Sequence, residues 1–237
     1  MLVQYFFIGI VLLLAAALST FKRKLTPAAS FAGWLTGMLI FAGAGWSGLL
    51  MLADFFSLGT WTTAIGKEKK ERLGLAAMGD SKSTAAQVIA NAGVATMISV
   101  GMLLNDTYNH IALLMIAASF AAATADTVSS ELGNVFGTRY FNIITLRKAE
   151  RGRDGVISIE GTLLGVAGSI IIGLCYSLFR SSLPDFIIIV AAGTVGNIVD
   201  SILGATAERK KILTNNGVNF LNTFAGALAA FLFNICK

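Results

Sequence analysis

The segment ADTVSSELGNVFGTRYFNIITLRKAERGRDGVISIEGTLLG, residues 125–165, decides how this chain can fold and where its chemistry can lie. It begins with a carboxylate and hydroxyl groups at the end of one apolar run, and it then crosses a basic loop that glycines interrupt. It enters a second apolar run directly behind Ser158, Glu160 and Thr162. The apolar runs are therefore expected to form a scaffold that brings further polar groups to the same face.

The composition is that of a membrane protein. Of the 237 residues, 55% are apolar and 13% are charged, and the mean hydropathy is +0.74. Soluble domains carry about 25% charged residues. The charges also cluster, which leaves charge-free runs long enough to span a bilayer. The sequence predicts an all-α, polytopic membrane helix bundle, with residues 1–237 as a single integral membrane domain and no nucleic-acid partner.

About seven transmembrane helices are expected. The charge-free runs place them at residues 2–21, 31–53, 83–105, 111–125, 161–179, 186–207 and 218–235. The first run lacks a basic segment before it and is interpreted as an uncleaved anchor, although AAALS at 15–19 leaves a cleaved signal peptide as the alternative. The run FFSLGTWTTAIG, residues 55–66, is either a short re-entrant helix covered by protein or a loop at the membrane interface.

Lysine and arginine residues indicate the orientation. Most of the 18 lie in segments 67–82, 132–160 and 208–217, and basic loops favour the cytoplasmic side. This rule places the N-terminus and the active site inside and the C-terminus outside. The cluster Lys22–Lys24 falls on the opposite side and conflicts with the assignment. The short N-terminus without a transit peptide favours a prokaryotic plasma membrane.

Four stripes of polar residues interrupt the apolar helices close to the basic loops. Each stripe follows helical spacing: Gln87 and Asn91; Asp126 and Ser130, with Thr127 and Glu131 beside them; Asn197 and Asp200; and Asn215, Asn219 and Asn222. Taken singly, such residues also hold helices together or cap them. Ionisable groups inside spans, however, usually face the protein interior or a wet cavity. Four stripes on the same membrane side predict one cavity that opens to the cytoplasm.

The chemistry expected of this cavity is phosphate chemistry. Mg²⁺ prefers one or two carboxylates together with phosphate oxygens, which makes Asp126 and Glu131 candidate metal ligands, with Asp200 behind them or at a second metal. Phosphate groups would be held or oriented by three sets of residues: the cations Lys82, Arg147, Lys148 and Arg153; the amides Asn91, Asn197, Asn219 and Asn222; and Ser130, Asp154, Ser158, Glu160 and Thr162 at the loop and the following helix N-terminus. The positive-inside signal alone would also explain the basic loop.

Two other classes of site are excluded. The sequence contains no G-x-x-x-x-G-K-[ST] motif and no protein-kinase signature set. The single histidine, His110, lies in a short turn on the opposite side from the polar stripes, so acid–base catalysis by histidine is not expected.

Several blocks of the sequence resemble a known family. These blocks are LGLAAMGDSKSTAAQVIANAGVA (73–95), ADTVSSELG (125–133), TLRKAERGRDGVISIEGTLLG (145–165), GNIVDSILGAT (196–206) and NNGVNFLNTFAGAL (215–228). They look like blocks of the transmembrane-protein-19-like family, which includes the plant chloroplast phytyl-phosphate kinase. The resemblance covers most of the chain from about residue 30.

A more distant similarity links the same segments to phytol and dolichol kinases. Their acidic, glycine-rich and Lys-[ST]-x-Glu-Gly-[ST] blocks look like Asp126-x-x-Ser129, Gly133-x-x-Phe136-Gly137 and Ile157-Ser158-x-Glu160-Gly161-Thr162. Ile157 departs from this pattern, because the kinases have lysine there. The resemblance implies CTP, or another nucleoside triphosphate, as phosphoryl donor together with Mg²⁺.

The resulting hypothesis is transfer of a phosphoryl group from a nucleoside triphosphate to an isoprenyl monophosphate, giving the diphosphate. Asp126, Glu131, Lys82, Arg153, Glu160 and Asp200 are the candidate catalytic residues. Three alternatives stay open: a kinase that acts on the isoprenoid alcohol, a transporter or flippase for an anionic lipid, and a cytidylyltransferase. Intramembrane carboxylates and glycine-rich helices also occur in transporters.

Overall fold

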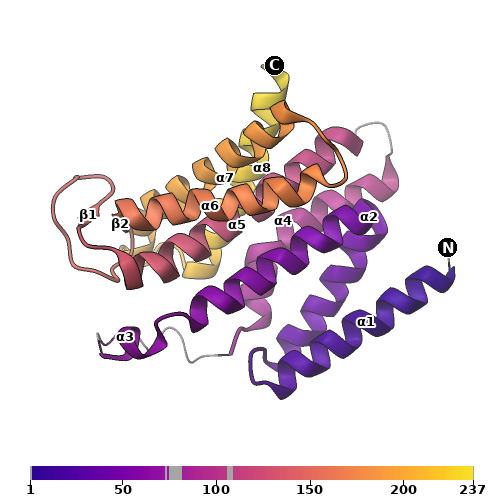
Figure 1. The fold of residues 1–237 in the computed structure, drawn as a ribbon, viewed down its shortest axis with the longest axis horizontal. Helices are drawn as coiled ribbons and strands as arrows, with labels where there is room; N and C mark the ends of the chain where they lie inside the picture. Colours follow the sequence, from indigo (N-terminus) through magenta and orange to yellow (C-terminus); the bar gives the residue numbers. More distant parts are fainter. Residues whose placement is uncertain (1, 73, 75–81, 106–108, 237) are drawn as a thin grey trace.

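The computed structural model describes residues 2–72, 74, 82–105 and 109–236, and it confirms an all-α polytopic bundle (Figure 1). Its elements are α1 (Leu2–Phe21), α2 (Pro27–Ala64), α3 (Lys67–Arg72), α4 (Ala85–Leu104), α5 (Asn109–Phe136), β1 (Tyr140–Asn142), β2 (Val156–Ser158), α6 (Ile159–Ser177), α7 (Leu183–Leu203), the π-helical turn η3 (Gly204–Glu208) and α8 (Asn215–Ile235). Among the described residues, seven helices are long and apolar enough to cross a membrane.

Helix α2 differs most from the expected boundaries. The helix expected at 31–53 and the re-entrant helix or interfacial loop expected at 55–66 are not separate elements, because α2 runs through both ranges as one 38-residue element. Its break lies at Gly45, whose φ of 63° and ψ of −151° are accessible almost only to glycine. The ribbon reverses direction there (Figure 1). A 38-residue helix would be about 57 Å long, nearly twice a hydrocarbon core, and the reversal divides it into two limbs of about one bilayer each.

Side-chain contacts fix the direction of each limb. The first limb is antiparallel to α1, since the rings of Tyr5 and Phe41 are 5.5 Å apart and the hydroxyls of Thr20 and Ser30 are 2.5 Å apart. The second limb is parallel to α5. Gly59 lies beside Thr127, and the Thr63 hydroxyl donates to Glu131 at 3.2 Å. The two limbs therefore form a helical hairpin with Gly45 at its tip.

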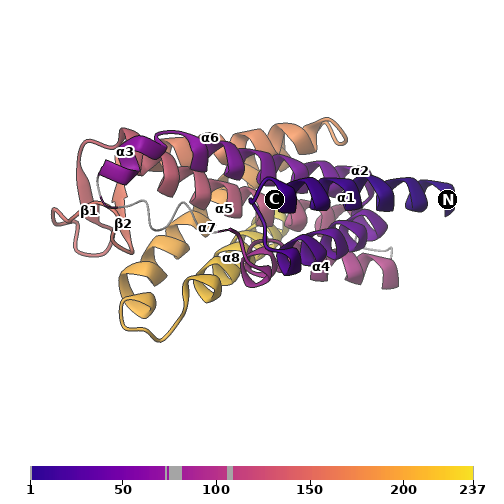
Figure 2. The same ribbon diagram turned by 90° about the horizontal axis from the view of Figure 1, so that it is seen from below.

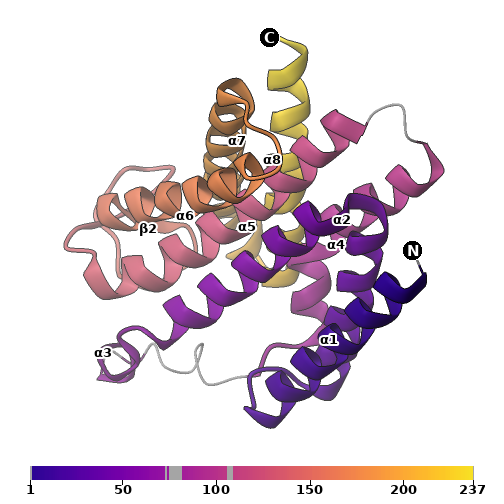
Figure 3. The same cartoon turned by 45° about the vertical axis from the view of Figure 1, so that its right-hand side comes forward.

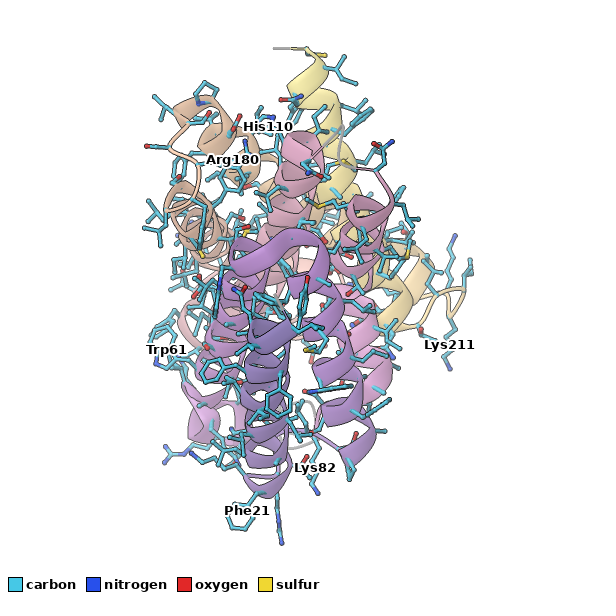
Figure 4. The ribbon with its side chains drawn as sticks, turned by 90° about the vertical axis from the view of Figure 1, so that its right-hand side faces the viewer. Phe21, Trp61, Lys82, His110, Arg180 and Lys211 are labelled. Atoms are coloured by element: carbon cyan, nitrogen blue, oxygen red, sulfur yellow. The ribbon has the colours of Figure 1, made fainter. Side chains whose placement is uncertain are left out.

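This hairpin corrects the expected placement of the termini on opposite sides. Both termini and the bend of α2 lie away from the end of the bundle that carries α3, β1 and β2 (Figure 1). Phe21 and Lys82 lie at the end opposite His110 and Arg180 (Figure 4). Leu25 pairs with Ser83 in a β-bridge, so Lys22–Lys24 join the basic segments instead of opposing them. Among the Lys and Arg residues that the structure describes, only Arg180 lies outside the segments of the basic end.

Helix α5 is the centre of the bundle, with α6, α7 and α8 on one side and α2 and α4 on the other (Figure 3). Alanines occupy much of its buried surface, and Ala117, Ala118 and residues 121–123 are fully buried. Small residues allow close approach of helix backbones in a bilayer. Gly193 of α7 lies against Ala121, and Gly226 of α8 lies against Ala118 and Ala122. This close packing fixes the heights at which the polar residues of the three helices meet.

The basic end carries the only strands in the described part of the chain. β1 and β2 form an antiparallel pair in which Tyr140 faces Ser158. Ser158 is also the N-cap of α6, because its Oγ accepts from the backbone N–H of Gly161 at 3.1 Å. The strand pair, α3 and the η3–α8 connection all lie toward this end (Figure 2). The loop from α5 to α6 is thus folded back over the bundle end.

Candidate active site at the basic end

A cavity of about 1700 Å³ opens at the basic end of the bundle. Small-molecule sites usually have volumes of about 300–1,000 Å³, so this cavity has room for more than one ligand. Most of the residues expected at the site line it: Lys82, Asn91, Asp126, Ser130, Glu131, Arg153, Asp154, Ser158, Thr162, Asn197, Asp200 and Asn219. The convergence expected from the polar stripes is therefore present.

Two carboxylates meet in the lining of this cavity. Asp126 of α5 and Asp200 of α7 lie within hydrogen-bonding reach of each other, and the Ser130 hydroxyl is 3.5 Å from Asp126 Oδ1. Neither carboxylate forms an ion pair with lysine, arginine or histidine in the described ranges. Two half-buried carboxylates this close cannot both stay ionised at low cost unless a positive group lies beside them, so the arrangement suits a cation bound from outside the chain.

Helix packing brings these two carboxylates together. Gly196 of α7 lies against Ala122 of α5, and Asn197, the next residue of α7, accepts from the Ser129 hydroxyl at 3.1 Å. Asp126 lies between Ala122 and Ser129 on α5, and Asp200 follows Asn197 by three residues on α7. Each carboxylate therefore lies about one turn from the Ser129–Asn197 hydrogen bond.

Several polar side-chain atoms in or beside this cavity lack a hydrogen-bond partner in the part of the chain that the structure describes. Asp200 Oδ1, Asn91 Oδ1 and both side-chain polar atoms of Asn222 are buried without a hydrogen-bond partner of good geometry among the described residues. Buried polar atoms are nearly always paired, by protein, water or ions. Asp126 and Asp200 supply hard oxygen atoms, and Mg²⁺ usually takes one or two carboxylates plus waters and phosphate oxygens. The residues present therefore fit a divalent cation held by Asp126 and Asp200.

Glu131 lies apart from this pair. It accepts a hydrogen bond from Thr63 and forms an ion pair with the buried Lys70 of α3. The described residues contain no cluster of three or more His, Cys, Asp or Glu side chains arranged to hold a metal. The three-carboxylate set expected from the sequence is thus reduced to two, and Glu131 connects α5 to α2 and α3.

The loop-to-helix segment is built differently from the expected anion pocket. Ser158 is buried, and its hydroxyl caps α6, while the Thr162 hydroxyl donates to the Ser158 carbonyl at 3.0 Å. Glu160 accepts from the Thr138 hydroxyl at 2.6 Å, and it does not line the cavity. Glu160 therefore stabilises the turn after α5 and is not brought to the carboxylate pair.

The basic residues fall into two groups. Lys82 and Arg153 line the cavity, with Arg153 also paired to Glu150 at 2.6 Å. Arg147 and Lys148 are exposed on the far part of the β1–β2 loop and do not line it. Asp154 lines the cavity, and its carbonyl accepts from Arg209 Nε at 2.8 Å, which ties the loop to η3.

The loop approaches η3 very closely. Gly155 has a φ of 66°, and a Cβ there would lie 2.3 Å from the backbone nitrogen of Ala205. Only glycine combines this backbone conformation with this contact. Gly155 therefore holds the loop against the cavity rim.

Three of the four asparagines expected at the site line the cavity, and other groups lie near it that the sequence does not indicate. Asn91, Asn197 and Asn219 line the cavity, whereas Asn222 is fully buried beside Asp200. The buried position of Lys70 cannot be predicted from the sequence, because KEKKER (67–72) gives no indication of which lysine turns inward. Arg151 contacts Tyr140 by a 2.6 Å hydrogen bond and by packing over its ring, and only the strand register brings those two residues together.

Comparison with known proteins identifies the family. A family model described as "Integral membrane protein DUF92" matches residues 10–227. The chain belongs to the DUF92 family of integral membrane proteins. No solved structure matches it.

The relatives of this DUF92 protein occur in bacteria, archaea and plants. An uncharacterized membrane protein of Synechocystis is 33% identical over 221 residues, covering 92% of this chain and 86% of the relative. An uncharacterized membrane protein of Methanocaldococcus jannaschii is 33% identical over 227 residues, covering 95% of this chain and 93% of the relative. "Protein VTE6, chloroplastic" of Arabidopsis thaliana is 30% identical over 209 residues, covering 85% of this chain and 62% of the relative.

Proposed function

We propose that this DUF92 protein transfers a phosphoryl group from a nucleoside triphosphate, with CTP as the expected donor, to an isoprenyl monophosphate. The observation that carries the proposal is the cavity in which Asp126 and Asp200 meet beneath cationic and amide side chains. The similarity to VTE6, and the resemblance to the transmembrane-protein-19-like family with its plant phytyl-phosphate kinase, favour a lipid phosphate as acceptor.

The chain's own groups would act by positioning and by electrostatics. Phosphoryl transfer needs the attacking and leaving oxygens in line, with charge on the transferred group neutralised, and little covalent chemistry from the protein. Lys82 and Arg153 would hold phosphate oxygens at the rim, while Asn91, Asn197 and Asn219 would orient them from the wall. A monophosphate acceptor is already ionised, so no strong general base is required.

Asp126 and Asp200 would hold the divalent cation. The cation, when bound, supplies positive charge that neutralises phosphate oxygens of both substrates. Ser130 would keep the Asp126 carboxylate oriented through its hydroxyl. Glu131 would instead position the second limb of α2 through Thr63 and helix α3 through Lys70.

The basic end is proposed to face the cytoplasm of a prokaryotic cell. Lys22–Lys24, α3, the β1–β2 loop and the η3–α8 connection all belong to this end, which satisfies the positive-inside rule without the conflict present in the sequence alone. Nucleoside triphosphates would then reach the cavity directly from their own compartment.

The test uses purified protein in lipid nanodiscs with Mg²⁺, γ-labelled CTP or ATP, and matched isoprenyl alcohols and monophosphates. The proposal expects label in the lipid diphosphate. Label in a lipid monophosphate would identify an alcohol kinase instead. Release of pyrophosphate with a CMP-bearing lipid would identify a cytidylyltransferase. Movement of labelled lipid across liposomes without nucleotide consumption would identify a transporter.

A further inference from the structure

The cavity at the basic end continues into an apolar region between α1 and α2. We define this apolar limb by Leu12, Ala15 and Ala16 of α1 and by Leu49, Leu52 and Phe56 of α2, all of which line the cavity. Leu49 precedes Thr63 by 14 residues on the second limb of α2, which corresponds to about 20 Å along the helix axis. The far end of the apolar limb is therefore farther from Thr63 than the hydrocarbon thickness of one leaflet, which is about 15 Å.

Both helices change from apolar to polar in the same direction. On the second limb of α2, Leu49, Leu52 and Phe56 are followed on the same face by Gly59 and Thr63. On α1, Leu12, Ala15 and Ala16 are followed by Ser19, and then by Lys22 and Arg23 at the rim. The two stripes thus lead from a hydrocarbon environment to a cationic one, which matches a ligand with an apolar tail and an anionic head.

Helix α1 forms the outer wall of the apolar limb. Among the described elements, α2 is the only one that α1 contacts more than incidentally, and Ile8 is the only buried residue of α1. Hydrogen bonds between α1 and α2 lie on either side of Leu12, Ala15 and Ala16 of α1. Trp34 Nε1 donates to the Gly9 carbonyl at 3.1 Å, and Thr20 bonds Ser30. The three cavity-lining residues lie between these hydrogen bonds, with the bilayer on the other face of α1.

We propose that the apolar limb binds the hydrocarbon tail of an anionic lipid, which enters laterally from the bilayer past α1 and places its phosphate near Asp126 and Asp200. This inference rests on the proposed function and adds the place of the tail and its route. The acceptor never leaves the membrane, while the nucleotide arrives from the aqueous side through the basic rim. The limb also selects substrates by tail length.

One test does not depend on turnover. The protein in nanodiscs is irradiated with geranylgeranyl phosphate that carries a diazirine at the tail end, and the labelled peptides are mapped by mass spectrometry. The label is expected on residues 12–16 of α1 and 49–56 of α2, and unlabelled geranylgeranyl phosphate should remove it. Label spread over the outer faces of α4 and α7, or label that is not competed, would overturn the inference.

A second test uses a matched pair of variants. Ala16→Phe fills the limb, whereas Ala17→Phe adds the same ring at an exposed neighbour that does not line the cavity. Ala16→Phe should raise the KM for geranylgeranyl phosphate at least about tenfold and leave the KM for isopentenyl phosphate unchanged. Only the long tail of geranylgeranyl phosphate reaches the apolar limb. The proposed tail site would be contradicted if Ala16→Phe and Ala17→Phe changed the KM for geranylgeranyl phosphate equally. It would also be contradicted if Ala16→Phe changed the KM for both substrates equally. Absence of turnover in the unmodified protein would refute the proposed function, and the photolabelling would still decide the tail site.

Discussion

Asp126 of α5 and Asp200 of α7 bring their carboxylates within hydrogen-bonding reach of each other inside the cavity, each about one helical turn from the Ser129–Asn197 hydrogen bond. In the described structure neither carboxylate has a cationic side chain as a partner. Helix packing therefore places two acidic side chains together without a cationic side chain beside them. Such an arrangement is expected where a cation or a phosphate-bound metal completes the site.

Removing either charge should abolish activity without unfolding the protein. Asp126→Asn and Asp200→Asn are each expected to lower kcat at least about 100-fold, since each removes preorganised charge from the site of transfer. Mg²⁺ should raise the melting temperature of the unmodified protein and not that of either variant. Asp54→Asn, a change to another intramembrane carboxylate outside this cavity, is the matched control and should behave like the unmodified protein. Full turnover in Asp126→Asn or Asp200→Asn would contradict the cation assignment.

The ion pair between Lys70 and Glu131 should stabilise the attachment of α3. The side chain of Lys70 is 9% exposed and that of Glu131 is 25% exposed, so this ion pair is intermediate between surface ion pairs and fully buried ones. A double-mutant cycle with Lys70→Met and Glu131→Gln should give a coupling free energy of about 1–3 kcal/mol in thermal unfolding. Lys67 and Glu71, an exposed pair on the same helix, should couple by less than about 0.5 kcal/mol. Equal coupling in the two pairs would show that Glu131 has no special structural role.

The helix reversal at Gly45 should tolerate no side chain. Gly45→Ala forces alanine into a conformation that it rarely adopts, so the free energy of unfolding is expected to fall by about 1–3 kcal/mol. Gly101→Ala is the control, because Gly101 lies within α4 and a Cβ there meets nothing within 4 Å. That variant should be equally stable or more stable, by up to about 1 kcal/mol. A neutral Gly45→Ala would place the break elsewhere in α2.

The two termini should report the same side of the membrane. Single cysteines at Leu2 and Ile235 are expected to react with an impermeant maleimide added to intact cells, since both lie at the end opposite the basic segments. Cysteines at Lys24 and Lys211 should react only after the membrane is opened. Labelling of position 2 and position 235 from opposite sides would show that α2 crosses the membrane once.

Much of this site follows from helical spacing in the sequence. Asp126 and Ser130 are one turn apart, and so are Asn197 and Asp200, and the structure places both pairs on the cavity wall. The glycines and alanines of α5 and α7 make it possible for those stripes to meet, but they do not reveal which residues meet. The pairing of the two stripes is seen in the hydrogen bond between Ser129 of α5 and Asn197 of α7, two residues that are 68 positions apart in the sequence.

The α2 hairpin could not be predicted in the same way. Its turn contains no proline and no charge, and Gly45 lies among other glycines at 43 and 48, so nothing in the local sequence marks it. Its position follows from contacts along α1 and α5, such as Tyr5 with Phe41 and Thr63 with Glu131. The role of Glu131 also depends on a contact that is distant in sequence, because its partner Lys70 lies on a separate short helix.

Stoichiometric product analysis tests the central claim most directly. Purified protein in nanodiscs is mixed with Mg²⁺, CTP and geranylgeranyl phosphate, and lipid and nucleotide products are quantified by mass spectrometry beside the Asp200→Asn variant. The account predicts one CDP for each geranylgeranyl diphosphate formed, and neither product from the variant. Folded protein that forms no lipid diphosphate with CTP or ATP, or a variant that forms it as fast as the unmodified protein, would contradict the account.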